Sequence, residues 1–152
     1  MKSTKTSLME AAGDLPQVSA FGVELLRNDL LKDMLGKEYS SILYWSGKNI
    51  ARKYPLSSTE EFQAFFAEAG WGDLDILQQK SQEMTFSLKG SVISTRFELY
   101  SDFSCNLEAG FLAEQIQRRL SVRAEAIEQK KKRSHEVLIT VQWDKKDPVD
   151  GQ

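Results

Sequence analysis

The sequence has only one cysteine and one histidine among its 152 residues. A single cysteine cannot form an intramolecular disulfide, and one histidine cannot complete most zinc or haem ligand sets. The formal net charge of -2 also leaves no basic excess that would gather nucleic acid or anionic lipid. We therefore expect no metal ion or other cofactor and no nucleic-acid partner.

Long apolar runs are missing as well. No segment approaches the roughly 18 apolar residues that a membrane-spanning helix needs. Residues 1–17 also lack the continuous apolar core of a secretory signal. Together with a single cysteine, which we expect to be reduced, these absences predict a cytoplasmic protein without a membrane span.

The usual catalytic signatures are absent too. The chain contains no GxGxxG, P-loop, GxSxG or HExxH motif, and we expect a protein that is not an enzyme. The lone His135 is interpreted as structural. The basic run from Lys130 to Arg133 has no aromatic residue within it, so we interpret it as a solvated hairpin turn.

What is present fits one globular domain. Hydrophobic residues make up 41% of the chain and charged residues 28%, which are ordinary globular values. A chain of this length buries enough surface for one core without disulfides. We predict a mobile arm at 1–17, a single α+β domain at 18–144 and a polar tail at 145–152.

Hydrophobic periodicity divides the domain into helices and strands. Helical spacing predicts helices over about 19–35, 38–53, 58–69 and 106–120. Ser58 and Glu61 form a capping-box pattern at the start of the third of these helices. In the first, Glu24 and Arg27 are interpreted as an exposed ion pair. Period-two alternation predicts strands at 84–89, 93–100, 122–126 and 137–143, with a weaker strand at 74–79.

This order of elements indicates the fold class. Helices come first, and two antiparallel hairpins then flank one helix that is apolar on nearly all sides. We predict an α+β fold, in which N-terminal helices pack on an antiparallel sheet of four or five strands and a buried helix is inserted between two hairpins.

Two segments offer candidate binding residues. Trp45, in the stretch SSILYWSGK, is interpreted either as core or as part of an apolar pocket. In CNLEAGFLAEQIQ, Gly110 lies inside a buried helix, where glycine costs about 1 kcal/mol relative to alanine. A sheet or a ligand is therefore expected to approach the backbone closely there.

Cys105 lies just before this helix, and two interpretations remain open. The positive end of the helix could acidify the thiol and make it nucleophilic or open to acylation. Alternatively, the cysteine is a buried small hydrophobe.

The residues Cys105, Gly110, Phe111, Leu112 and Ala113, followed by Glu125, resemble the pattern of the 4-vinyl reductase or hydrocarbon-binding domain. The segments FGVELLRNDLL, ILYWSGKNIAR, FFAEAGWG and LEAGFLAEQIQ together are similar to the YslB family of uncharacterised Gram-positive bacterial proteins. This resemblance implies an α+β ligand-binding fold that is often dimeric. The extra cysteines and the helical histidine of metal-binding and haem-binding relatives have no counterpart here.

These observations lead to two hypotheses. The first is a non-enzymatic domain that binds an apolar small molecule near Trp45, Phe66, Gly110 and Phe111, between the helices and the sheet. The second is a structural interaction module with a filled core, which acts by homodimerisation or partner docking. The excess of apolar faces on the early helices predicts a homodimer through the first two helices.

Overall fold

The computed structural model describes residues 8–149, and all structural statements concern this range. The helical elements are α1 (Leu8–Ala11), η1 (Ala12–Asp14), α2 (Ala20–Glu24), η2 (Leu25–Leu30), α3 (Leu31–Leu35), η3 (Gly36–Glu38), α4 (Tyr39–Lys53), α5 (Thr59–Ala69), α6 (Ser91–Leu99) and α7 (Asn106–Leu120). The strands are β1 (Asp73–Lys80), β2 (Glu83–Lys89), β3 (Val122–Lys131) and β4 (Glu136–Pro148).

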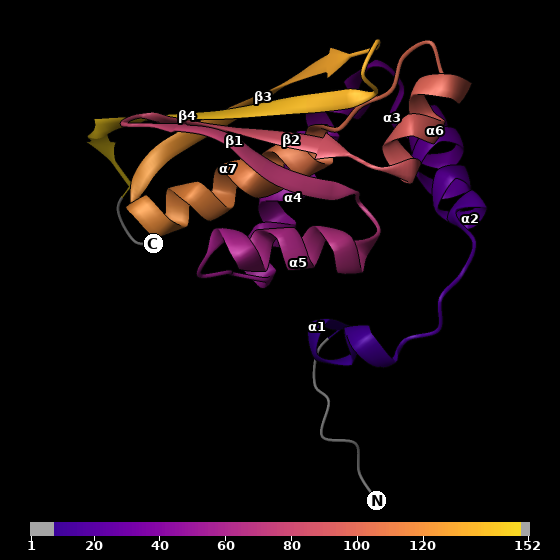
Figure 1. Cartoon of the computed structure of the whole chain (residues 1–152), viewed down its shortest axis with the longest axis horizontal. Coiled ribbons are helices and arrows are strands. Elements are labelled where there is room, and N and C mark those ends of the chain that lie inside the picture. The colour runs from indigo at the N-terminus through magenta and orange to yellow at the C-terminus, as the bar shows by residue number, and fades with distance from the viewer. Residues whose placement is uncertain (1–7, 150–152) are drawn as a thin grey trace, which may run out of the picture.

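The four strands form one antiparallel sheet in the order β1-β2-β4-β3. Two local hairpins, β1–β2 and β3–β4, meet along the pairing of β2 with β4. The helix α7 lies between the two hairpins in sequence and runs directly beneath the sheet (Figure 1). Helix α4 packs against α7, and α5 lies below α7 in the view of Figure 1. The predicted α+β class with a buried helix between two hairpins is thus confirmed.

The residues that face the helices fill one continuous core. Alternate residues of β3 and of the first half of β4 are buried, such as Val137, Ile139 and Val141 of β4. On the helical side, the ring of Phe111 stacks on that of Phe65 with 4.6 Å between centroids, and Phe66 and Trp71 lie edge-on to it. Aromatic rings therefore occupy the space between α5 and α7.

Helix α5 begins and ends as its sequence predicts. The Ser58 hydroxyl accepts a hydrogen bond from the Glu61 N–H, and the Glu61 carboxylate accepts one from the Ser57 N–H. Gly70 follows the helix with a φ of 71°, a left-handed conformation that favours glycine at a helix end.

One predicted element is wrong. Residues 93–100 were expected to be a strand, but Ser91–Leu99 form the helix α6, and the strand that pairs with β2 in the hairpin is β1. The buried residues Ile93, Arg96 and Phe97 recur at helical spacing. The helical period is hidden in the sequence because one member of the buried face is an arginine.

The chain ends also differ in detail from expectation. Of the arm expected at 1–17, residues 8–14 form short helical turns, and residues 1–7 lie outside the described range. The strand β4 runs to Pro148, which pairs with Val122, so the first residues of the expected tail at 145–152 belong to the sheet. Residues 150–152 lie outside the described range.

Candidate functional site

The four residues expected to line an apolar pocket do not surround a common space. Phe66 and Phe111 are buried against each other, with ring centroids 5.8 Å apart. Trp45 lies on the outer side of α4 with 61% of its surface exposed, so the core interpretation of this residue is wrong. Two pockets of the described region are lined by other residues.

Gly110 faces a helix rather than a sheet or a ligand. A Cβ atom built on Gly110 would stand 1.9 Å from the carbonyl oxygen of Tyr44 in α4. On the other side of the same crossing, a Cβ atom on Gly47 would stand 2.0 Å from the carbonyl oxygen of Leu107. The close approach inferred from Gly110 is real, and the backbone of α4 is what approaches.

Trp45 belongs to a small group at the surface of α4. Its ring lies edge-on to Tyr44, and the ammonium of Lys48 stands over both rings at 5.3 and 5.6 Å from their centroids. The Tyr44 hydroxyl accepts a hydrogen bond from the Ala126 N–H and so ties α4 to β3. This arrangement leaves the outer face of Trp45 free for a partner surface.

Cys105 is completely buried at the start of α7. Its backbone N–H donates to both carboxylate oxygens of Glu128 at 3.1 Å, and the Ser104 hydroxyl also donates to Glu128. Burial, together with the negative charge of Glu108, raises the pKa of the thiol well above its usual range. The geometry therefore fits a buried small hydrophobe better than an acidified nucleophile.

Next to Cys105 lies a buried ion pair. The Arg27 guanidinium donates to the Glu108 carboxylate at 2.5 Å and to the Ser104 carbonyl at 3.3 Å. Burial acts to lower the pKa of Arg27, but the charge and hydrogen bond of Glu108 outweigh it and raise this pKa overall. Arg27 thus stays charged inside the protein.

A second ion pair lies beside the first. The Glu24 carboxylate accepts three hydrogen bonds from the buried Arg96 of α6, at 2.9 to 3.2 Å. Glu24 and Arg27 were expected to pair with each other at the surface. That interpretation is wrong, because each of them binds a separate partner across the interface between the helix and the domain.

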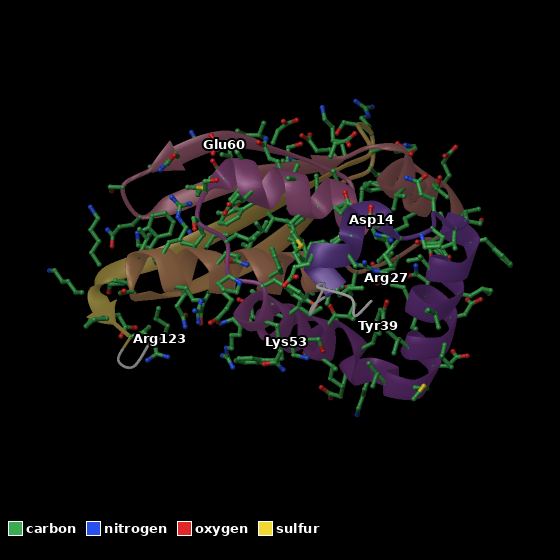
Figure 2. All side chains as sticks on the ribbon, turned by 90° about the horizontal axis from the view of Figure 1, so that it is seen from below. Asp14, Arg27, Tyr39, Lys53, Glu60 and Arg123 are labelled. Carbon is green, nitrogen blue, oxygen red and sulfur yellow. The ribbon has the colours of Figure 1, made fainter. Side chains whose placement is uncertain are left out.

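Glu24 and Arg27 belong to the 20–35 helix, which is the continuous helix formed by α2, η2 and α3. Its middle part, Leu25–Leu30, is a π-helical turn, in which the Leu31 N–H donates to the Leu26 carbonyl five residues back. An ordinary α-helical bond would have used the Arg27 carbonyl. That carbonyl instead accepts the Tyr39 hydroxyl at 2.6 Å, and Figure 2 shows Arg27 and Tyr39 between this helix and the rest of the domain.

The opposite side of the 20–35 helix is apolar and exposed. We call this surface the apolar side, and it consists of Phe21, Leu25, Leu26, Leu30 and Met34. In a regular α-helix, residues five apart such as Leu25 and Leu30 are about 140° apart around the axis. The π-turn brings residues five apart onto nearly the same side, so it extends the apolar side along the helix.

The 20–35 helix is therefore inverted relative to an ordinary surface helix. It turns the side chains of Glu24, Arg27 and Asn28 toward the protein and large apolar side chains toward solvent. Arg27 is only 6% exposed, whereas Phe21 is 69% and Met34 68% exposed. We take the apolar side as the candidate functional site.

Two further observations concern metal ligands and membrane spans in the described region. Between residues 8 and 149, no group of three or more His, Cys, Asp and Glu side chains is placed to hold a metal ion. None of the helices in this range is long and apolar enough to cross a membrane.

Comparisons with known proteins agree with the resemblance seen in the sequence. The model of the family described as Protein of unknown function (DUF2507) matches residues 20–142. Uncharacterized protein YslB of Bacillus subtilis (strain 168) is 52% identical over 133 residues, which are 88% of this chain and 90% of that protein. These matches confirm the predicted resemblance to the YslB family.

A solved structure has the same fold. The crystal structure of a vinyl-4-reductase family protein from Methanocaldococcus jannaschii matches with a TM-score of 0.67 and 15% identity, covering 89% of this chain and 87% of that one. At this level of identity the likeness concerns the fold alone. The α+β architecture is thus shared with that protein.

Proposed function

Because the chain belongs to the family described as Protein of unknown function (DUF2507), whose description assigns no activity, we propose a function from the geometry of the chain itself. The protein is a non-enzymatic interaction module that forms a homodimer through the apolar side of the 20–35 helix. The proposal includes a cytoplasmic location, as expected from the sequence.

One observation carries this proposal, namely the inverted burial of the 20–35 helix. Contiguous exposed apolar patches are characteristic of interaction sites, since each buried Å² of apolar surface stabilises by about 25 cal/mol. The inward ion pairs Arg27–Glu108 and Glu24–Arg96 fix which side of the helix faces out. The apolar side is therefore held outward by the fold, and a partner surface would remove it from water.

A second copy of the chain is the partner that the charges favour. The exposed residues Asp29 and Asp33 flank the apolar side together with Lys32 and Lys37. Two such helices in antiparallel order could place acidic residues of one copy beside basic residues of the other. A two-fold interface needs this self-complementarity. The exposed Ile42 and Trp45 of α4 offer a second, smaller apolar area for the same interface.

Sedimentation equilibrium at micromolar concentration tests the proposal. We expect the wild-type protein to have twice the 17.3 kDa mass of one chain, and the double variant Leu30→Glu/Met34→Glu to have the mass of one chain. Leu77→Glu is the matched control, because Leu77 is 56% exposed on β1 and far from this helix in sequence; this variant should remain dimeric. Circular dichroism checks that all three proteins are folded.

A wild-type mass of one chain would overturn the proposal. So would a double variant that is folded and still dimeric. If Leu77→Glu alone dissociated the dimer, the interface would lie on the β1 edge of the sheet instead.

Binding of an apolar ligand stays a prediction of its own. The rings of Phe65, Phe66, Trp71 and Phe111 lie in contact where the ligand was expected, so entry would require these rings to move apart. Titration with a fluorescent fatty-acid probe, together with mass spectrometry of the denatured protein, tests this hypothesis. Saturable binding that Phe111→Trp abolishes, with the fold retained, would favour a ligand-binding function.

A further inference from the structure

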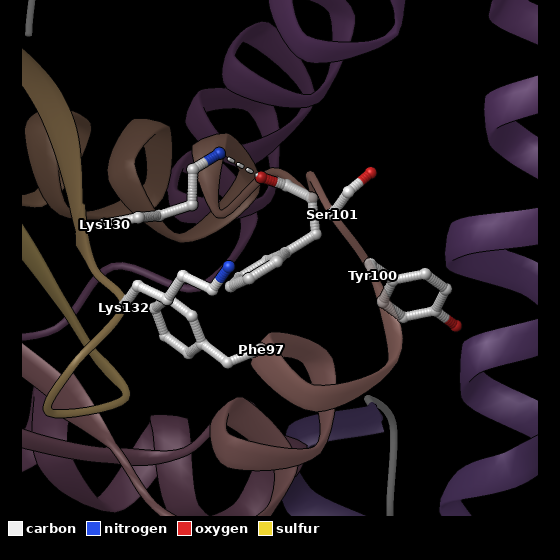
Figure 3. Close-up of a pocket in the computed structure, with 6 residues that line it drawn as sticks. Phe97, Tyr100, Ser101, Lys130 and Lys132 are labelled. Atoms are coloured by element: carbon white, nitrogen blue, oxygen red, sulfur yellow. Dashed lines mark hydrogen bonds between the residues drawn. The ribbon is translucent and has the colours of Figure 1, made fainter.

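A small pocket lies between α6, the segment that follows it and the turn between β3 and β4. Its volume is about 100 Å³, and its lining residues are Phe97, Tyr100, Ser101, Phe103, Lys130 and Lys132. Figure 3 shows two lysine side chains extending from the end of β3 and the following turn toward the aromatic residues. Both belong to the basic run that the sequence alone presents as a solvated turn.

The apolar wall of this pocket is fixed by ring contacts. Phe97 and Phe103 pack edge to face with 4.9 Å between centroids, and both are almost fully buried. The His135 ring stacks parallel to Phe97 at 5.2 Å. Because His135 has a φ of 52°, its ring is carried over Phe97 by a left-handed turn residue. The wall therefore consists of Phe97 of α6 and Phe103 of the segment that follows α6, with the ring of His135 stacked on Phe97.

The two lysines differ in their electrostatic partners. The Lys130 ammonium donates to the Asp102 carboxylate at 2.8 Å and also to the Phe103 carbonyl. The positive charge of Lys130 is therefore balanced by the carboxylate of Asp102. Lys132 forms no ion pair with any carboxylate of residues 8–149. The pocket lining thus carries one uncompensated positive charge next to an apolar wall.

We propose that this pocket binds a small monocarboxylate with a short apolar tail. The carboxylate pairs with the Lys132 ammonium, and the tail lies against Phe97 and Phe103. One unpaired cation matches one negative charge, whereas a dianion would leave a charge without a partner in the pocket. Since a cavity of about 150 Å³ accommodates benzene, this smaller pocket suits a tail of about three or four carbons. None of the residues that line this pocket belongs to the 20–35 helix of the proposed dimer interface.

The test is an NMR titration of the full-length protein with sodium butyrate, with sodium chloride added to the reference sample at matched ionic strength. Resonances of Phe97, Phe103 and the 130–135 turn should shift in a saturable way. Lys132→Gln should weaken binding about fivefold, the upper end of the range for an exposed ion pair. Lys131→Gln removes the same charge one residue earlier, outside the pocket lining, and should change the affinity less than twofold.

Two comparison ligands separate charge from apolar contact. Butyramide has the same tail without the charge and should bind more weakly than butyrate. Inorganic phosphate has charge without a tail and should leave the Phe97 and Phe103 resonances unshifted. The proposal is overturned if butyrate gives no saturable shift, if both lysine variants weaken it equally, or if phosphate or butyramide binds as well as butyrate.

Discussion

Gly47 of α4 and Gly110 of α7 lie at the same helix crossing, each against the backbone of the other helix. A Cβ atom on either glycine would come within about 2 Å of a carbonyl oxygen, Leu107 in one case and Tyr44 in the other. Backbone atoms cannot turn aside as a flexible side chain can. The two glycines therefore set the distance between α4 and α7.

Gly110→Ala should consequently destabilise the protein. Alanine is the better helix former by about 1 kcal/mol, but its methyl group must push the two helices apart, and overpacking costs about 1 to 3 kcal/mol or more. We expect urea denaturation to show a lower free energy of unfolding. Gly22→Ala is the control, because no atom lies within 4 Å of a Cβ built on Gly22 of α2. It should leave stability unchanged or raise it, and equal effects of the two variants would contradict the close crossing.

Replacing only one member of the buried Arg27–Glu108 ion pair should greatly lower the free energy of unfolding. Glu108→Gln leaves the buried guanidinium without its counter-charge, for which we expect a loss of about 3 to 5 kcal/mol in the free energy of unfolding. Combining Arg27→Met with Glu108→Leu should recover part of this loss in a double-mutant cycle. Breaking the exposed Arg123–Asp147 pair by Asp147→Asn should cost about 1 kcal/mol or less. Additive effects of Arg27 and Glu108 would argue against their coupling.

Glu128 should make stability depend on pH. Burial raises the pKa of this carboxyl above its ordinary value, although the Cys105 N–H, Lys130 and Ser104 act to lower it. A raised folded-state pKa means that the folded protein holds this proton more tightly than the unfolded chain. Its contribution to stability is therefore complete below the ordinary pKa of a glutamate and is lost as pH rises through the raised value.

Urea titrations of wild type and Glu128→Gln between pH 4 and pH 8 measure this contribution. The stability of wild type relative to the variant should fall as pH rises through the window just above the ordinary glutamate pKa. Glu125→Gln, exposed on the same strand, serves as the control. A difference between wild type and Glu128→Gln that does not change with pH would show that the proton affinity of Glu128 is the same in both states.

The Cys105 thiol should react slowly in the folded protein. It is fully buried and its pKa is raised, so little thiolate is exposed to a reagent at neutral pH. Labelling with a disulfide reagent should become fast only when urea unfolds the chain. Cys105→Ala should cost about 1 kcal/mol. Rapid labelling of the folded protein near pH 7 would instead support a redox or acylation role.

The sequence predicted the fold where hydrophobic period and local signals agree. The capping box at Ser58, the end of α5 at Gly70 and the continuous apolar stretch in α7 each have a local physical cause. The helix α6 was missed because Arg96 lies on its buried face, and only the distant Glu24 makes that burial possible. No period analysis of residues 91–99 alone could supply this partner.

The candidate sites likewise could not be predicted from local sequence, because they are formed by contacts between residues far apart along the chain. The periodicity of residues 20–35 indicated a helix, but nothing local indicated that its charges face inward, since Glu108 and Arg96 lie far along the chain. The close approach at Gly110 was predicted, but the sequence did not indicate that Gly47 of α4 lies on the other side of it. In the same way, the lysines at 130 and 132 gained aromatic neighbours only through folding.

The π-turn at Leu25–Leu30 determines how the residues after it are rotated about the helix axis relative to the residues before it. One residue more or less in a helix rotates everything beyond it by about 100°. Deleting a single residue from this turn would therefore leave the Glu24–Arg96 ion pair in place but rotate Leu30 and Met34 around the helix axis. It would also move the Arg27 carbonyl away from the Tyr39 hydroxyl. The inner ion pairs and the outer apolar surface thus share one register, so an insertion or deletion here cannot alter either surface without altering the other.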